Sequence, residues 1–173
     1  MKENANQQQF LTFVLGDIEL GLGILEVSQI IEHVPPTRVP HLPQVVRGVI
    51  NLRGSIVPVV DLAFKLGLEA QPVTKRSCIV IVETREAGQL GILADSVREV
   101  IELPAGDVLP TPSFGVPVRA DYLLGLGKVR EKLVLLLDSA RLLTPSELLV
   151  TAEAIPALPP EVTAAAPMAE TAA

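Results

Sequence analysis

The chain has 173 residues, 49% of them hydrophobic and 3% aromatic, with a formal net charge of −6 and a single cysteine. Its length allows a core without disulfide or metal support, and the acidic charge with few aromatic rings disfavours nucleic-acid binding. Charged residues interrupt every apolar run before it reaches the roughly 20 residues of a membrane span, so direct membrane insertion is not expected.

Short β-rich segments separated by turns fill the first part of the chain. Residues 1–8 are polar and are expected to fray, and the lack of an apolar signal-peptide core predicts a cytoplasmic protein. Gly16 and Asp17 predict a two-residue hairpin turn between two strands. Segment 24–31 has apolar residues at helical spacing, but its β-branched content favours an extended or single-turn form.

A proline-rich connector leads into the stretch RGVINLRGSIVPVVDL, residues 47–62. The stretch predicts a strand at 45–50, a turn at 51–55 and a second strand at 56–62, with a short helix directly after it. Proline lacks the backbone donor of a sheet ladder, so Pro58 is expected at a sheet edge or at a bulge.

Further strands and a helix are predicted in the second half. They are a hairpin of 77–84 with 90–97, a strand at 98–103 that continues its sheet, a hairpin at 122–138 and a helix at 139–149. Asp138 or Ser139 is the expected N-cap of that helix. Ala, Pro, Glu and Thr dominate the last segment, so 151–173 is expected to be a disordered tail rich in Ala and Pro.

The sequence lacks most of the residue combinations that a catalytic site requires. The two histidines, His33 and His41, flank the proline-rich connector, and no third metal ligand accompanies them. Cys78 lies in an apolar strand and is interpreted as a small buried hydrophobe. We therefore predict a binding module without enzymatic activity, cofactor or metal. The alternative is a β-barrel enzyme or ligand-binding protein, which requires a concave pocket with converging polar groups.

The stretch RGVINLRGSIVPVVDL resembles the CheW family of bacterial chemotaxis coupling proteins. The other motifs in family order are QFLTFVLGDIELGLGILEVSQI, CIVIV, GILADSVREVIEL, YLLGLG, LVLLLD and SARLLTPSELL. The resemblance covers about residues 9–149, and it indicates a CheW-like domain at 9–150. Many short strands with glycine-bearing turns favour two small barrels, and no repeat of 20–50 residues is apparent.

The resemblance implies a mainly β fold of two interlaced five-stranded barrels, SH3-like or OB-like, with a short C-terminal helix. It also implies a non-catalytic coupling protein that links the cytoplasmic tips of chemoreceptors to the regulatory domain of the histidine kinase CheA. Such a protein is recruited to membrane-associated receptor arrays. The same adaptor role in a circuit for twitching, gliding or second-messenger control stays open.

Receptor-binding residues are carried over from the family position by position. They are Val27, Gln29, Gly48, Arg53, Gly54, Ile79, Gly91 and Val100. Core packing is the alternative role for Val27 and Ile79, and backbone geometry is the alternative for the three glycines.

One position departs from the family pattern. The family usually has a glutamate where this chain has Gln29, and that acid is expected to pair with the arginine matching Arg53. The pair is then reduced to a hydrogen bond between the Arg53 guanidinium and the Gln29 amide. Arg53 is otherwise expected to meet a carboxylate of a partner, or of Glu26 or Glu32.

Overall fold

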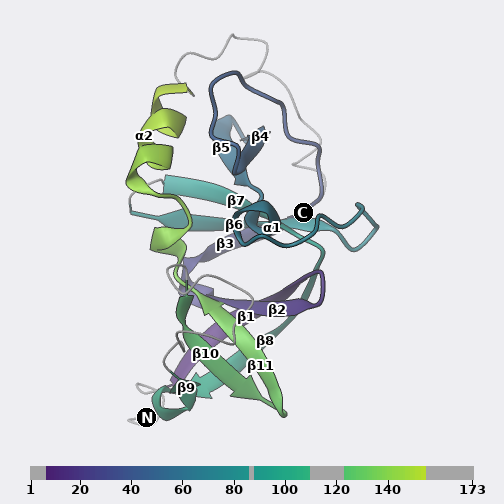
Figure 1. Ribbon diagram of the computed structural model, residues 1–173, viewed down its shortest axis with the longest axis vertical. Coiled ribbons are helices and arrows are strands. Elements are labelled where there is room, and N and C mark those ends of the chain that lie inside the picture. Colours follow the sequence, from purple (N-terminus) through teal and green to yellow (C-terminus); the bar gives the residue numbers. More distant parts are fainter. Residues whose placement is uncertain (1–6, 86–87, 110–122, 155–173) are drawn as a thin grey trace.

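The computed structural model describes residues 7–85, 88–109 and 123–154, and its strands form two sheets, one above the other in Figure 1. The lower sheet has the order β8 (Ser96–Pro104), β1 (Gln7–Leu15), β2 (Ile18–Gly23), β11 (Lys132–Leu137), β10 (Leu123–Val129), β9 (Val108–Leu109). The upper sheet has the order β3 (Val27–Glu32), β6 (Cys78–Thr84), β7 (Gly88–Ala94), β5 (Ser55–Val60), β4 (Val46–Leu52). The mainly β fold expected from the sequence is confirmed; the lower sheet gains only the two-residue β9 beyond five strands.

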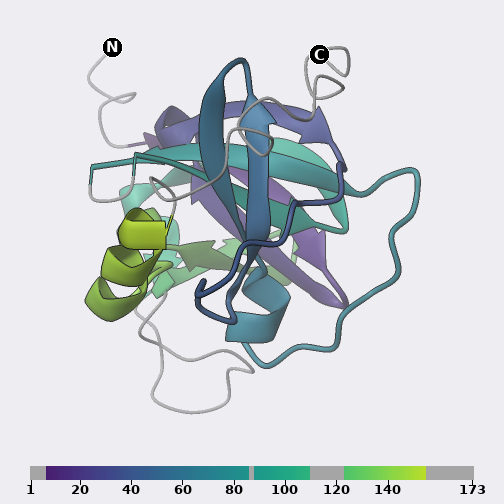
Figure 2. The ribbon, with the colours of Figure 1, turned by 90° about the horizontal axis from the view of Figure 1, so that it is seen from above.

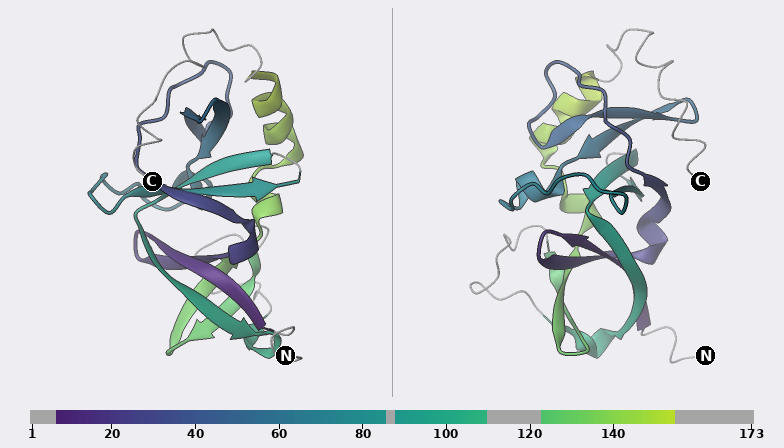
Figure 3. Two further views of the ribbon diagram at one scale, coloured as in Figure 1. Left: turned by 180° about the vertical axis from the view of Figure 1, so that it is seen from behind. Right: turned by 90° about the vertical axis from the view of Figure 1, so that its right-hand side faces the viewer.

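The chain alternates between the sheets, which is how the two barrels interlace. It begins in the lower sheet with β1 and β2, builds the upper sheet from β3 to β7, and returns to the lower sheet from β8 onward. The expectation that 98–103 continues the sheet of 77–97 is therefore wrong, because β8 pairs with β1. Figure 3 shows the ribbon of β8 curving from the upper half into the lower half.

Short helical turns connect the strands. They are η2 (Ile24–Glu26), α1 (Leu62–Lys65), η3 (Ala105–Asp107) and η5 (Ser139–Arg141), and a longer helix α2 (Pro145–Ala154) follows the last strand. The single turn η2 followed by a strand confirms the single-turn expectation for 24–31. No helix in the described ranges is long and apolar enough to cross a membrane.

A shared apolar seam holds the two sheets together. Its buried side chains come from both sheets and include Phe13, Leu20, Leu22, Val80, Val82, Leu90, Ile92 and Leu137. Successive side chains of a strand point to opposite faces, so Ile79 and Ile81 turn away from the seam into the interior of the upper barrel. Each such buried aliphatic side chain stabilises the fold by about 1.5–3 kcal/mol.

Pro58 lies inside the upper sheet and not at its edge. Val49 stands opposite Pro58 on β4, and both backbone polar groups of Val49 bond to Thr37, at 2.8 and 2.9 Å. Pro58 and Val49 therefore exchange no backbone hydrogen bonds. The side of Pro58 that lacks an N–H donor faces β7 instead. Parallel pairing of β5 with β7 begins only at Val59. Pro58 is thus tolerated where a ladder starts, and the expectation of an edge or bulge is wrong.

The two sheets contain the same supersecondary unit, although the sequence shows no obvious repeat. β4–β5 and β10–β11 are hairpins with two-residue turns, and the second strand of each pairs in parallel with a strand from the other half of the chain. Arg53 and Arg130 begin the two turns, and Asp61 and Asp138 follow the two hairpins at the same spacing. Both aspartates cap the next helical turn through their side chains.

A close backbone crossing occurs at the start of each hairpin. A Cβ atom on Gly48 would lie 2.3 Å from the carbonyl oxygen of Thr37, and one on Gly125 would lie 2.5 Å from that of Leu109. These distances are far below van der Waals contact, so each crossing admits only glycine. The backbone role offered for Gly48 as an alternative to receptor contact is therefore required by the fold.

The predicted helix at 139–149 is divided into η5 and α2. Asp138 caps η5 by accepting from the Ala140 N–H at 3.1 Å, and α2 then starts at Pro145. Proline has no N–H and therefore favours a first helical position over a helix interior. Helix α2 continues to Ala154, beyond the expected start of the tail at 151; residues 155–173 and 1–6 lie outside the described residues.

A buried ion pair fastens α2 to the upper half of the molecule. The Lys65 ammonium, with 5% of its side chain exposed, lies 2.6 Å from Glu147 Oε1. Glu147 also accepts from the Thr144 N–H at 2.8 Å, and the Thr144 hydroxyl accepts from the Glu147 N–H at 3.1 Å, which forms a capping box. Burial raises the pKa of Glu147, but the hydrogen bonds from Lys65 and Thr144 lower it more, so the net pKa lies below 4.5.

Replacing Gly48 by alanine tests the backbone crossing. We expect Gly48→Ala to lower the free energy of unfolding by about 1–3 kcal/mol, because the added methyl group overlaps the Thr37 carbonyl. Urea denaturation measures the change. Gly106→Ala is the control, since no atom lies within 4 Å of the place that its added methyl group would occupy. Equal stability of Gly48→Ala and the wild type would contradict the crossing.

Neutralising Glu147 tests the attachment of α2. Glu147→Gln is expected to lower the free energy of unfolding by about 1.5–3 kcal/mol near pH 7, whereas Glu153→Gln on the exposed face of α2 changes it little. The folded-state pKa of Glu147 is depressed, so its contribution is present above about pH 4.5 and is lost as pH falls through the folded value. Denaturation at pH 7 and pH 3 therefore shows a difference between wild type and Glu147→Gln that shrinks at pH 3; a difference that grows there contradicts the assignment.

Candidate partner-binding surface

The β4–β5 hairpin projects from the upper sheet and presents a two-residue turn (Figure 2). Arg53 and Gly54 form this turn with φ values of 53° and 88°. Two successive residues with positive φ define a type I′ turn, whose twist matches that of the strands. Asn51 Oδ1 accepts from the Gly54 N–H at 2.8 Å and so fastens the turn to the end of β4. Gly54 supplies backbone geometry, as expected for a residue with φ > 0.

Arg53 is exposed at this turn and makes no hydrogen bond or ion pair with another described residue. The hydrogen bond to Gln29 considered from the sequence is absent; Gln29 lies on β3, where it pairs with Ile81. Neither Glu26 nor Glu32 takes the place of Gln29. An arginine in the left-handed region costs about 1–2 kcal/mol relative to an ordinary backbone conformation, and here no intramolecular ion pair offsets that cost.

Two of the sequence candidates are interior residues. Ile79 has 0% of its surface exposed, in the core of the upper barrel. A Cβ atom on Gly91 would lie 2.8 Å from Ile79 Cγ2, so Gly91 makes room for that isoleucine. Receptor binding by these residues stays a prediction, and any effect they have on binding acts through packing.

Three other candidates reach the surface. Val27 and Gln29 are half-buried on β3 and flank an irregular step in its pairing with β6. Val100 is 48% exposed on β8, in the other sheet. The structure therefore places the eight candidates in four settings: an exposed turn, the backbone crossing at Gly48, a barrel interior and the outer faces of β3 and β8.

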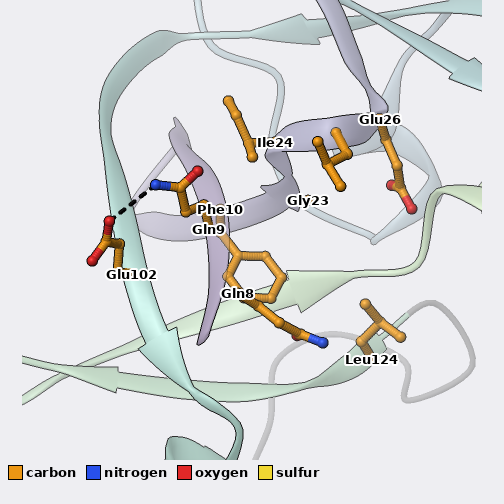
Figure 4. Close-up of a pocket in the computed structure, with 9 residues that line it drawn as sticks. Gln8, Gln9, Phe10, Gly23, Ile24, Glu26, Glu102 and Leu124 are labelled. Carbon is orange, nitrogen blue, oxygen red and sulfur yellow. Dashed lines mark hydrogen bonds between the residues drawn. The ribbon is translucent and has the colours of Figure 1, made fainter. Parts of the chain in front are cut away.

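A groove of about 550 Å³ opens between η2, the start of β1 and the far end of β8. Its lining residues, all drawn in Figure 4, are Gln8, Gln9, Phe10, Gly23, Ile24, Leu25, Glu26, Glu102 and Leu124. Leu25 is 98% exposed and Leu124 54% exposed, so the groove has apolar walls open to solvent. Glu26 precedes Val27, and Glu102 lies two residues after Val100, so this groove adjoins two of the sequence candidates.

Sequence reasoning did not single out the groove. The apolar pattern of 24–31 grouped Ile24, Val27 and Ile31 on one face, and Leu25 falls off that face. Leu25, an isolated leucine outside the periodic pattern, was the only sequence feature in 24–31 that could have indicated the groove. The sequence did not indicate that Leu124 is exposed, because it lies among other apolar residues of a predicted strand.

The pKa shifts of Cys78 and His33 arise mainly from burial. Burial raises the pKa of the Cys78 thiol, and the nearby Asp95 carboxylate raises it further, so the thiol is held in its protonated, poorly nucleophilic form. Burial lowers the pKa of His33. Among the described residues, no group of three or more His, Cys, Asp or Glu side chains is placed to hold a metal ion.

Fold and surface together define a β-protein that offers an exposed arginine and an apolar groove to partners. The family model for the CheW-like domain matches residues 9–147. Chemotaxis protein CheW of Klebsiella aerogenes is 35% identical over 141 residues, covering 82% of this chain and 84% of that protein. The chain belongs to the CheW family.

Other relatives extend the comparison. Protein FrzA of Myxococcus xanthus is 30% identical over 120 residues, covering 69% of this chain and 74% of FrzA. The crystal structure of the scaffolding protein TtCheW from Thermoanaerobacter tengcongensis superposes with a TM-score of 0.75 at 28% identity, covering 81% of this chain and 90% of TtCheW.

Asparagine at position 53 tests the backbone cost of the exposed turn. Asparagine adopts positive φ more readily than arginine, so Arg53→Asn is expected to raise the free energy of unfolding by up to about 1 kcal/mol. Arg85→Asn is the control, because Arg85 is also exposed but has a negative φ. Chemical denaturation measures both, and a destabilised Arg53→Asn would show that the arginine side chain stabilises the free protein.

Proposed function

We propose that this chain is a non-catalytic coupling protein that links the cytoplasmic tips of chemoreceptors to the regulatory domain of the histidine kinase CheA. The observation that carries the proposal is Arg53: an exposed guanidinium that pairs with none of the described residues, on a projecting turn whose backbone favours glycine or asparagine. Arg130 shares this backbone conformation but lies 3.9 Å from Glu99. Arg53 keeps the costly conformation without pairing to a described residue, which points to a function outside the fold. The guanidinium is suited to bind a carboxylate in a bidentate manner.

The receptor-facing surface in this proposal has a direct and an indirect part. Arg53, Val27, Gln29 and Val100 contact the receptor tip, and the groove beside Leu25 extends that surface. Gly48, Gly54, Ile79 and Gly91 act indirectly, because they shape the hairpin and the upper barrel. An amphipathic helix of a receptor tip would suit the apolar walls of the groove, and an acidic side chain elsewhere on the tip would suit Arg53.

A coupling role requires two partners and no chemical step, and it brings the protein to receptor arrays at the membrane. The protonated state of the Cys78 thiol supports a role without covalent catalysis. The match to FrzA supports a second candidate, in which the same adaptor role serves a different chemosensory circuit. Both candidates use the same surface and differ only in the receptors and kinase that are present.

Charge reversal at the turn tests the proposal. Arg53→Glu is expected to weaken binding to a receptor-tip hairpin from the same organism by about tenfold or more, since it places like charges together. Binding to the CheA regulatory domain is expected to persist. Isothermal titration measures both affinities, and circular dichroism verifies the fold.

Arg130→Glu is the matched control for that experiment, because Arg130 begins the equivalent two-residue turn of the lower sheet with a φ of 49°. This variant is expected to bind the receptor tip like the wild type. Equal losses in the two variants would indicate a general charge effect, and no binding of the wild type to either partner would overturn the coupling role.

A further inference from the structure

The two equivalent turns differ in a hydrogen bond from the turn backbone to the side chain that precedes the turn. Both contain two residues with positive φ, and both begin with an arginine. Asn51 precedes the first turn and accepts from the Gly54 N–H at 2.8 Å, whereas Lys128, at the matching position before the second turn, has no acceptor atom in its side chain. The chain therefore builds the same turn once with and once without this bond.

The bond at Asn51 is thus not required for a two-residue turn in this fold. Its geometric effect falls on the peptide unit between Arg53 and Gly54, because the N–H of that unit is the donor. The orientation of this peptide unit depends on ψ of Arg53 and φ of Gly54. Fixing the N–H therefore suppresses a flip of the peptide and holds the backbone from which the Arg53 side chain extends.

We propose that Asn51 is a positioning residue that fixes the turn for partner binding by Arg53. The inference rests on the proposed function, in which Arg53 meets a carboxylate of the receptor tip. A turn fixed before binding loses less conformational freedom on binding than a mobile one, so the affinity is higher for the same contacts. Asn51 need not touch the receptor to have this effect.

A double-mutant cycle tests the proposal with the receptor-tip hairpin as the probe. Asn51→Leu removes the acceptor at similar size and is expected to weaken binding roughly three- to tenfold, the range of a single hydrogen bond. Asn51→Asp keeps an acceptor oxygen and is expected to restore most of the affinity. In the Arg53→Ala background, Asn51→Leu is expected to have no further effect, because there is no guanidinium left to position.

Several outcomes separate this inference from the proposed function. If Arg53→Ala weakens binding while Asn51→Leu binds like the wild type, the positioning role is wrong and the coupling role stands. An equal loss from Asn51→Leu with and without Arg53 also overturns the positioning role, since it shows an effect independent of the arginine. Lys128→Leu, at the other turn, is the matched control and is expected to leave binding unchanged.

A measurement without any partner tests the same inference if the wild type fails to bind. NMR relaxation of the Gly54 amide is expected to show greater mobility in Asn51→Leu than in the wild type or in Asn51→Asp. The Glu131 amide of the second turn serves as an internal reference that does not change. Identical Gly54 relaxation in the three proteins overturns the positioning role, whatever the binding result.

Discussion

The apolar seam between the two sheets is the constraint on which the rest of the structure depends. The lower sheet combines β1 and β2 from the start of the chain with β8 to β11 from its second half, whereas the upper sheet is built from the continuous segment β3 to β7 that lies between them in the sequence. Alternation along β6 sends Val80 and Val82 into the seam and Ile79 and Ile81 into the upper barrel, so the strand is buried on both faces. With the seam occupied by packing, partner binding is left to the outer faces and the projecting hairpin.

That hairpin combines rigidity with exposure. Its base is fixed by the crossing of Thr37 over Gly48, and its tip by the bond from Gly54 to Asn51. Between these two fixed points the strands are paired along their length, so the Arg53 backbone has little freedom. The equivalent hairpin of the lower sheet has the same base but lacks the bond at its tip. The two sheets therefore share an architecture and differ in the hydrogen bond on which the proposed positioning role depends.

Much of the architecture was predictable, because glycine-bearing turns and alternating apolar residues are local signals. Long-range pairing was not: β8 follows β7 directly in the chain yet pairs with β1, and Pro58 sits inside a sheet because a tertiary contact occupies Val49. For the site, the exposure of Arg53 was predictable from its turn, whereas the absence of a hydrogen bond between Arg53 and Gln29 depends on the tertiary placement of two distant strands. The repeated unit escaped detection because its two copies share few residues beyond Arg53 and Arg130, Asp61 and Asp138, and the crossing glycines.

The interlaced path also governs how the protein emerges from the ribosome. The β1–β2 hairpin is made first, but β11, its parallel neighbour, is among the last strands to be synthesised. The faces of β1 and β2 that line the lower barrel therefore stay uncovered until β10 and β11 are made, and the lower barrel closes only near the end. An early hairpin without its covering strands is the kind of surface that chaperones bind, so the nascent chain is a natural client for them.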